Sequence, residues 1–204
     1  MTRVICLEGI TGAGKTTQAA KIASLLDSRC EDYQIISEKQ YEPFKQTIIN
    51  WHLAGANQYF TQKVIKSIAK ARGKTHRRHI VPLIDTVSLL IFDRCFYTSG
   101  IYEADGELKV DEIIDINLKE GVIIPQEGVV LSCSPEIARK RIDERRLKIS
   151  RYNLPSMYES LEEITKRRSL YIQLCDEHPE LYLIDTTNKT EDEVFEEVRR
   201  RLKL

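Results

Sequence analysis

The chain has 204 residues, enough for one domain with a substantial core, and 31 Lys and Arg side chains balance 31 Asp and Glu. This neutral balance argues against a nucleic-acid partner, which would require a broad basic excess. The apolar runs are far too short to cross a bilayer and the five cysteines show no metal-ligand spacing, so we expect a cytoplasmic protein without a membrane partner.

Taken in chain order, the hydrophobic pattern predicts strands that alternate with helices. Short apolar runs that read as buried strands are Arg3–Glu8, Tyr33–Ser37, Ser88–Asp93, Gly128–Cys133 and Leu181–Asp185. Helical patterns cover Lys15–Leu26, Glu42–Leu53, Gln58–Ile84, Val110–Leu118, Pro135–Leu147, Tyr158–Asp176 and a last helix that starts with a capping box at Thr190. We therefore expect one α/β domain over residues 1–204, with a five-stranded parallel sheet flanked by helices.

The segment after the first predicted strand carries the strongest chemical signal. Residues 9–16 read GITGAGKT and fit G-x-x-x-x-G-K-[ST], in the required position between a strand and a helix. Glycines let backbone N–H groups face phosphates at a helix N-terminus, where the helix dipole favours anions. We expect this loop to bind ATP, with Lys15 reaching the β- and γ-phosphates and Thr16 ligating Mg²⁺. The loop residues expected to bind ATP are Gly9, Thr11, Gly12, Ala13, Gly14, Lys15, Thr16 and Thr17.

The third predicted strand ends on a carboxylate, Asp93. Ligands of open α/β sheets bind at the carboxyl ends of the strands, where this residue lies. Asp93 is therefore expected to hold a water of the Mg²⁺ shell or to position a substrate. The alternative interpretation is an ordinary acid at a strand end that caps the following turn.

An arginine-rich segment follows the fourth predicted strand. Residues 139–151 read RKRIDERRLKISR, with seven Lys or Arg against two acids. Phosphoryl transfer requires neutralisation of negative charge, so this pattern favours a mobile lid over about 139–155, with a break near Ser150 and Pro155. A solvated helix face with ion pairs is the alternative, but only Arg139–Asp143 and Lys140–Glu144 pair opposite charges four residues apart.

Four segments together resemble the thymidylate kinase family. They are LEGITGAGKTTQ at 7–18, FDR at 92–94, SPEIARKRIDERR at 134–146 and LIDTTNKTEDEVFEEV at 183–198. The resemblance runs from Val4 to the C-terminus and includes the spacing from Arg72 to Asp93. It implies a P-loop kinase fold, a homodimer, and transfer of phosphate from ATP with Mg²⁺ to a nucleotide acceptor, dTMP, giving dTDP.

The resemblance also implies roles for individual residues. Arg72 and Arg94, with Tyr102 and Glu42 nearby, would hold the acceptor. The segment Asp185–Lys189 would flank adenine, and Arg146 or Arg151 would join the lid. The residues expected to act in catalysis are Lys15, Asp93, Arg94, Arg141 and Arg145, and those expected to bind the metal are Thr16 and Asp93.

Three departures from the family pattern fall around the acceptor. Thr11 stands where an acid is usual, Tyr41 where an arginine is usual, and Cys95 where an aromatic residue or His is usual. A second interpretation is therefore a deoxynucleoside kinase, or another kinase with a hydroxyl acceptor, in which Glu42 takes the proton. A third is a non-enzymatic nucleotide switch, because NKTE at 188–191 comes close to the guanine-specifying N-K-x-D.

Overall fold

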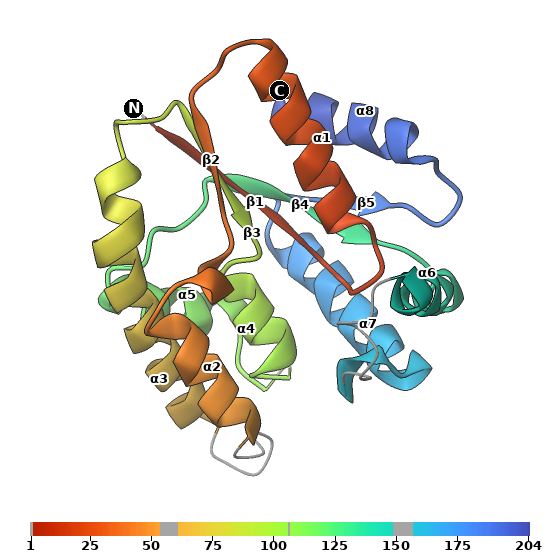
Figure 1. Ribbon diagram of the computed structural model, residues 1–204. Helices are drawn as coiled ribbons and strands as arrows, with labels where there is room; N and C mark the ends of the chain where they lie inside the picture. The colour runs from red at the N-terminus through yellow and green to blue at the C-terminus, as the bar shows by residue number, and fades with distance from the viewer. Residues whose placement is uncertain (1, 54–60, 106, 149–156) are drawn as a thin grey trace. The chain divides into compact units, whose positions relative to one another are not determined.

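The computed structural model describes residues 2–53, 61–105, 107–148 and 157–204. Its strands form a five-stranded sheet in the order β2-β3-β1-β4-β5 (Figure 1). Their bounds are Arg3–Gly9 for β1, Tyr33–Ile36 for β2, Leu89–Asp93 for β3, Glu127–Ser132 for β4 and Leu181–Asp185 for β5. The pairs β2–β3 and β4–β5 are parallel, with Tyr33 opposite Leu89 and Gly128 opposite Leu181. The predicted α/β fold is confirmed, and every predicted strand lies within about one residue of its observed bounds.

The helices follow the predicted pattern with three differences. Their bounds are Lys15–Ser28 (α1), Phe44–Leu53 (α2), Thr61–Thr75 (α3), Phe96–Tyr102 (α4), Val110–Lys119 (α5), Pro135–Lys148 (α6), Leu161–Glu177 (α7) and Glu191–Leu202 (α8). The helix predicted over 58–84 ends at Thr75 and continues as a π turn and a 3-10 turn that contains Pro82. The helix predicted from Tyr158 begins instead at Leu161, after the N-cap Ser160. Helix α4 was not predicted.

The chain divides into two compact units. One unit contains residues 1–6 and 25–127, and the other contains 7–24 and 128–204. The boundary falls inside β1, between Cys6 and Leu7, so this strand contributes residues to both units. Within the described ranges, no helix combines the length and apolar character needed to span a bilayer.

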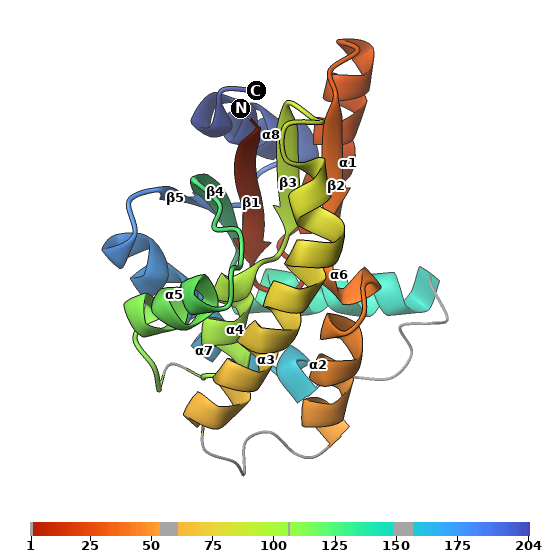
Figure 2. The ribbon, with the colours of Figure 1, turned by 90° about the vertical axis from the view of Figure 1, so that its left-hand side faces the viewer.

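In the first unit, helices α2 and α3 lie side by side, and α5 packs against α3 and α4 (Figure 2). An apolar cluster between α2 and α3 explains their contact: Phe44, Ile48, Val64 and Ile68 are buried, and Trp51 packs against them. Burial of each such side chain contributes about 1.5–3 kcal/mol. The Trp51 indole also donates to the Ser67 hydroxyl at 3.1 Å, which fixes the pairing of the two helices.

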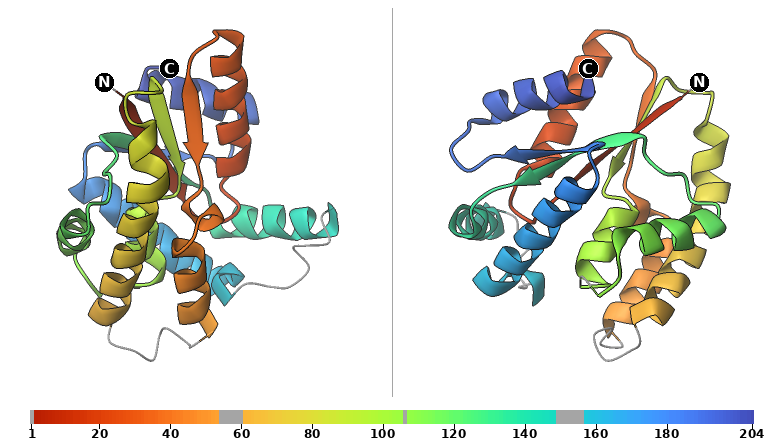
Figure 3. Two further views of the ribbon diagram at one scale, coloured as in Figure 1. Left: turned by 60° about the vertical axis from the view of Figure 1, so that its left-hand side comes forward. Right: turned by 180° about the vertical axis from the view of Figure 1, so that it is seen from behind.

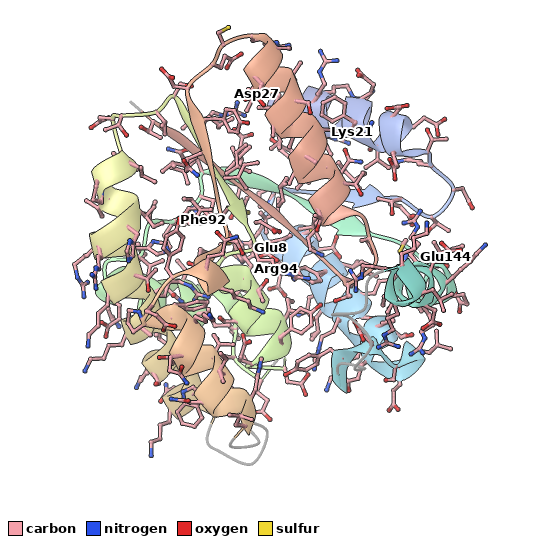
Figure 4. The ribbon with its side chains drawn as sticks, in the orientation of Figure 1. Glu8, Lys21, Asp27, Phe92, Arg94 and Glu144 are labelled. Atoms are coloured by element: carbon pink, nitrogen blue, oxygen red, sulfur yellow. The ribbon has the colours of Figure 1, made fainter. Side chains whose placement is uncertain are left out.

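In the second unit, helices α7 and α8 pack on β5 and α6 packs on α7 (Figure 3). The predicted capping box of α8 is present, because the Thr190 hydroxyl accepts from Glu193 N while the Glu193 carboxylate accepts from Thr190 N. Helix α8 is also held to α1, where Lys21 pairs with Asp192 at 2.6 Å (Lys21 is labelled in Figure 4). These contacts fix the elements that surround the loop after β1.

Candidate active site

The loop between β1 and α1 is built around Lys15. Its ammonium group donates to the carbonyl oxygens of Gly9 at 2.9 Å and Ile10 at 2.8 Å, and the residue is 8% exposed. The strand end that leads into the loop is anchored as well, because the Tyr171 hydroxyl donates to the buried Glu8 carboxylate at 2.7 Å. A positive charge is therefore held over the N-terminus of α1, where the helix dipole already favours an anion.

Two glycines show why this loop needs residues without a side chain. A Cβ atom at Gly12 would lie 2.6 Å from the carbonyl oxygen of Ala138, so the loop passes too close to α6 for any other residue. Gly14 has a φ of +98°, a conformation that L side chains rarely adopt, and among the described residues other than its own chain neighbours no atom lies within 4 Å of the position of its Cβ. The loop is thus closed against α6 at Gly12 and open beside Gly14.

The first turn of α1 suits a magnesium ion that is shared with a phosphate ligand. Thr16 is exposed there, next to the buried Lys15. Across the described ranges, no three or more His, Cys, Asp or Glu side chains gather into a metal site of their own. Mg²⁺ commonly takes one or two protein oxygens and completes its octahedron with water and substrate phosphate oxygens. The Thr16 hydroxyl fits that pattern.

Helix α6 brings Arg141 to the phosphate loop. Its guanidinium donates to the hydroxyl and the carbonyl oxygen of Thr186, both at 3.0 Å, and to the carbonyl oxygen of Gly12 at 3.4 Å. The Thr186 hydroxyl in turn donates to the carbonyl oxygen of Ala13 at 3.3 Å. Arg141 therefore links the loop to the segment after β5, which the resemblance assigns to adenine.

The other arginines of α6 are paired with acids. Arg145 and Arg146 both contact the Glu159 carboxylate, Arg145 at 3.6 Å, and Arg139 pairs with Asp143 at 2.9 Å. Glu159 lies outside the arginine-rich segment 139–151. The spacing of charges within that segment therefore did not reveal that Arg145 and Arg146 contact Glu159. Helix α6 continues without a break to Lys148; the predicted lid residues 149–155, including Arg151, lie outside the described residues.

The first unit contains a cavity of about 200 Å³. Side chains of both charges and two apolar side chains of α2 line it: Ser37, Glu38, Lys39, Phe44, Ile48, Arg72, Asp93, Arg94, Cys95, Thr98, Ser99 and Glu103. Three residues singled out by sequence, Arg72, Asp93 and Arg94, are thus brought together in this pocket. Arg94, which is labelled in Figure 4, follows β3 with a φ of +69°. Its guanidinium carbon lies 5.4 Å from the centroid of the Tyr102 ring.

Arg72 lies in a buried polar network that sequence reasoning did not anticipate. The residue is 2% exposed, and its Nε donates to both carboxylate oxygens of Glu38, at 2.9 and 2.8 Å. The other two guanidinium nitrogens donate to Asn117 and Ser99, each at 3.1 Å. The positive charge of Arg72 is therefore largely matched inside the protein.

His76 completes this network from the π turn after α3. Its Nε2 lies 2.6 Å from Glu38 Oε1, and its Nδ1 accepts from the backbone N–H of Ile123 at 3.0 Å. Since Nδ1 accepts, the proton sits on Nε2 and the ring donates to Glu38. Burial acts to raise the pKa of Glu38, but the Arg72 charge and the His76 hydrogen bond outweigh it and hold that pKa below its usual value.

Glu42 lies apart from this pocket's lining. Its side chain is exposed, and Oε2 accepts from the backbone N–H of Gln46 at 3.1 Å in the first turn of α2. This is the position of a helix-capping acid. Its expected part in acceptor binding stays a prediction.

Comparison with known proteins decides the family. A sequence model described as thymidylate kinase matches residues 7–198. The chain belongs to the thymidylate kinase family. A probable thymidylate kinase of Archaeoglobus fulgidus is 27% identical over 199 residues, which cover 97% of this chain and 93% of the relative. A thymidylate kinase of Leptospira borgpetersenii is 26% identical over 95% of this chain and 89% of its own length.

A solved structure agrees with the architecture. Thymidylate kinase from Ehrlichia chaffeensis superposes with a TM-score of 0.68 over 100% of this chain and 99% of its own, at 17% identity, which supports the fold. The thymidylate kinase family places the chain among the nucleoside monophosphate kinases, phosphotransferases that use ATP with Mg²⁺.

Several residues of the pocket and loop carried no signal in the sequence. Glu38, His76 and Asn117 surround Arg72 only after folding, and Glu159 reaches Arg145 from beyond α6. A buried acid and a surface acid look alike in a sequence, so these partners follow from the tertiary structure alone.

Proposed function

We propose that this chain transfers the γ-phosphoryl group of ATP to dTMP, forming dTDP and ADP. The observation that carries the proposal is the phosphate loop, in which Lys15 is held across the loop carbonyls at the start of α1. The family match over residues 7–198 supports the choice of acceptor.

The loop residues would bind the donor. Backbone N–H groups of residues 9–17 would hold the β- and γ-phosphates, and Lys15 would neutralise charge on the oxygens between them. The magnesium ion, held through Thr16, would draw electron density from the transferred group. Arg141 lies against the loop, so it would need little movement to contact a phosphate, whereas Arg145 would first have to leave Glu159.

The pocket of the first unit would bind the acceptor. Because Glu38 already matches the charge of Arg72, Arg94 and Lys39 would carry most of the positive charge toward the acceptor phosphate. Asp93 would position the acceptor or a metal-bound water from the end of β3. An acceptor phosphate oxygen is already an anionic nucleophile and needs no base, in agreement with the exposed, helix-capping position of Glu42.

An acceptor panel tests the proposal. The purified chain is given ATP and Mg²⁺ with dTMP, dUMP, UMP, AMP or thymidine, and ADP release is followed. We expect turnover of dTMP and none of thymidine. Turnover of thymidine without dTMP would replace the proposal with a kinase that has a hydroxyl acceptor.

Three further features belong to the proposal. The working unit is a homodimer, which light scattering coupled to size-exclusion chromatography tests. The location is the cytoplasm.

The arginine-rich segment 139–155 closes over ATP as a lid. If the lid closes, ATP should protect this segment from limited proteolysis, and equal cleavage with and without ATP would argue for a static helix.

A further inference from the structure

The guanidinium group of Arg72 is held at three nitrogens and on one face. Nε donates to the Glu38 carboxylate, and the two terminal nitrogens donate to the Asn117 amide oxygen and the Ser99 hydroxyl, each at 3.1 Å. The Phe44 ring covers one face, with its centroid 4.7 Å from the guanidinium carbon. A guanidinium group carries five N–H groups, so within the described ranges one N–H on each terminal nitrogen stays available to a ligand in the cavity that Arg72 lines.

Asn117 differs from the other groups that hold Arg72. Glu38 and Ser99 line the cavity in the described part of the chain, whereas Asn117 is fully buried and does not. Its Nδ2 donates to the backbone carbonyl of Ile113 at 2.8 Å, while its Oδ1 accepts from Arg72. Because a guanidinium only donates and a carbonyl only accepts, this amide orientation is the one that makes both bonds. Any effect of Asn117 on a ligand in the cavity must therefore pass through Arg72.

The backbone of α5 is anchored to α3 one turn beyond Asn117. A Cβ atom at Gly73 would lie 2.1 Å from the carbonyl oxygen of Glu120, so the two helices approach too closely there for any other residue. Arg77 donates to the same carbonyl at 2.7 Å. Glu120 is the C-cap of α5 and follows Asn117 by three residues. This close approach fixes where the amide of Asn117 meets the guanidinium of Arg72.

An arginine that is already ion-paired contributes to binding mainly through the direction of its N–H groups. Glu38 matches the charge of Arg72, so the two N–H groups that remain offer hydrogen bonds rather than a free positive charge. Hydrogen bonds weaken steeply when the angle at the hydrogen falls toward 120°. A rotation of the guanidinium plane would therefore weaken what Arg72 can bind, even with its ion pair intact.

We propose that Asn117 is a positioning residue for the acceptor nucleotide: it sets the plane of the Arg72 guanidinium and thereby aims the two remaining N–H groups into the pocket. The inference rests on the proposed function, since it assumes that this pocket holds the acceptor. It assigns to α5, which lies behind the pocket wall, a part in acceptor binding.

Steady-state kinetics of Asn117→Ala test the inference. Values of kcat and KM are measured for dTMP and for ATP with Mg²⁺. KM for dTMP should rise on the order of 10- to 100-fold, since a small displacement of a positioning group has effects of this size. KM for ATP and kcat at saturating dTMP should stay close to those of the wild type, as expected for lost binding of the acceptor alone. Asn50→Ala, the same change at an exposed position of α2, should alter none of these values.

A double-mutant cycle shows whether Asn117 acts through Arg72. Arg72→Lys keeps a positive charge opposite Glu38 but removes the planar fork of donors. If Asn117 acts by orienting that fork, adding Asn117→Ala to Arg72→Lys should raise KM for dTMP little beyond the value of Arg72→Lys alone. If the two increases in KM multiply, Asn117 acts independently of Arg72 and the inference is wrong.

The remaining outcomes separate this inference from the proposed function. Turnover of dTMP with the same KM in wild type and Asn117→Ala would overturn the inference and leave the proposed function standing. A lower kcat with both KM values unchanged would also overturn it, because that pattern marks a loss of folded enzyme. A wild type that neither binds nor phosphorylates dTMP would overturn both. Where Asn117→Ala fails to fold, Asn117→Leu, which fills the vacated volume, is judged by the same criteria.

Discussion

Glu38→Gln should destabilise the fold strongly, because it removes the carboxylate from a buried ion pair and leaves Arg72 in place. Arg72 is 2% exposed, and its Nε donates to both oxygens of Glu38. Breaking a buried pair by removing one partner costs about 3–5 kcal/mol. For a chain of this length, about 2–4 °C of melting temperature is lost per kcal/mol, so we expect a fall of roughly 6–20 °C.

Urea and thermal unfolding followed by circular dichroism measure this loss. A matched control is Glu196→Gln, which removes the exposed Arg199–Glu196 pair at 2.9 Å and should cost at most about 1 kcal/mol. The double variant Glu38→Gln/Arg72→Met should recover part of the stability, since no buried charge is then left alone. If Glu38→Gln unfolds at the same temperature as the control, the pair contributes nothing to stability and the reasoning is wrong.

The same pair predicts how stability depends on pH. The pKa of Glu38 is lowered in the folded state, although burial acts against this, because Arg72 and His76 favour the ionised form. A lowered folded-state pKa gives stabilisation that is complete above the unfolded value of about 4.3 and is lost as the pH falls through the folded-state pKa. The stability gap between wild type and Glu38→Gln should therefore narrow in acid below about pH 4. A gap that stays constant to pH 3 would contradict this assignment.

Three further substitutions test the proposed roles. Lys15→Ala should lower kcat on the order of 10²–10³-fold in a protein that still folds, and near-normal turnover would remove Lys15 from the donor site. Arg141→Ala should weaken ATP binding in calorimetry, because it removes the link between Gly12 and Thr186; unchanged affinity would leave Arg141 a purely structural role. Loss of a general base lowers kcat on the order of 10²–10⁴-fold. Glu42→Gln should reduce turnover of dTMP far less than this, and a loss of that size would favour a hydroxyl acceptor.

The strands and the phosphate loop could be predicted because their signals are local. Apolar runs bounded by turns indicate β1 and β3. The spacing of Gly9, Gly14 and Lys15 defines the phosphate-loop motif. Helix α4 was missed because FYTSGIY is short, rich in aromatic and β-branched residues, and forms by burial of every one of its side chains. The end of α3 was missed because His76 is tied to Glu38 and Ile123, contacts that the local pattern does not contain.

The pocket could be predicted only in part. The spacing of Arg72 and Asp93 pointed to two residues that now line one cavity, but the chemistry around Arg72 depends on Glu38, thirty-four residues earlier in the chain. The burial of the Glu103 carboxylate, whose Oε1 lies 3.8 Å from His52 Nε2, likewise appears only when its neighbours are placed. Sequence spacing can indicate which residues lie close together. Whether the charge of a side chain such as Arg72 is already neutralised by another protein group depends on the folded structure.

The division inside β1 has a consequence for how such a kinase can change over time. The described contacts of the phosphate loop lie in one compact unit, and those of the proposed acceptor pocket lie in the other. Substitutions that remodel Glu103 or Arg72 would therefore leave the packing of the ATP loop intact. Under the proposed function, this separation would let the choice of acceptor change while the donor site is preserved. The first unit would then be the part to exchange between relatives when new substrate ranges are engineered.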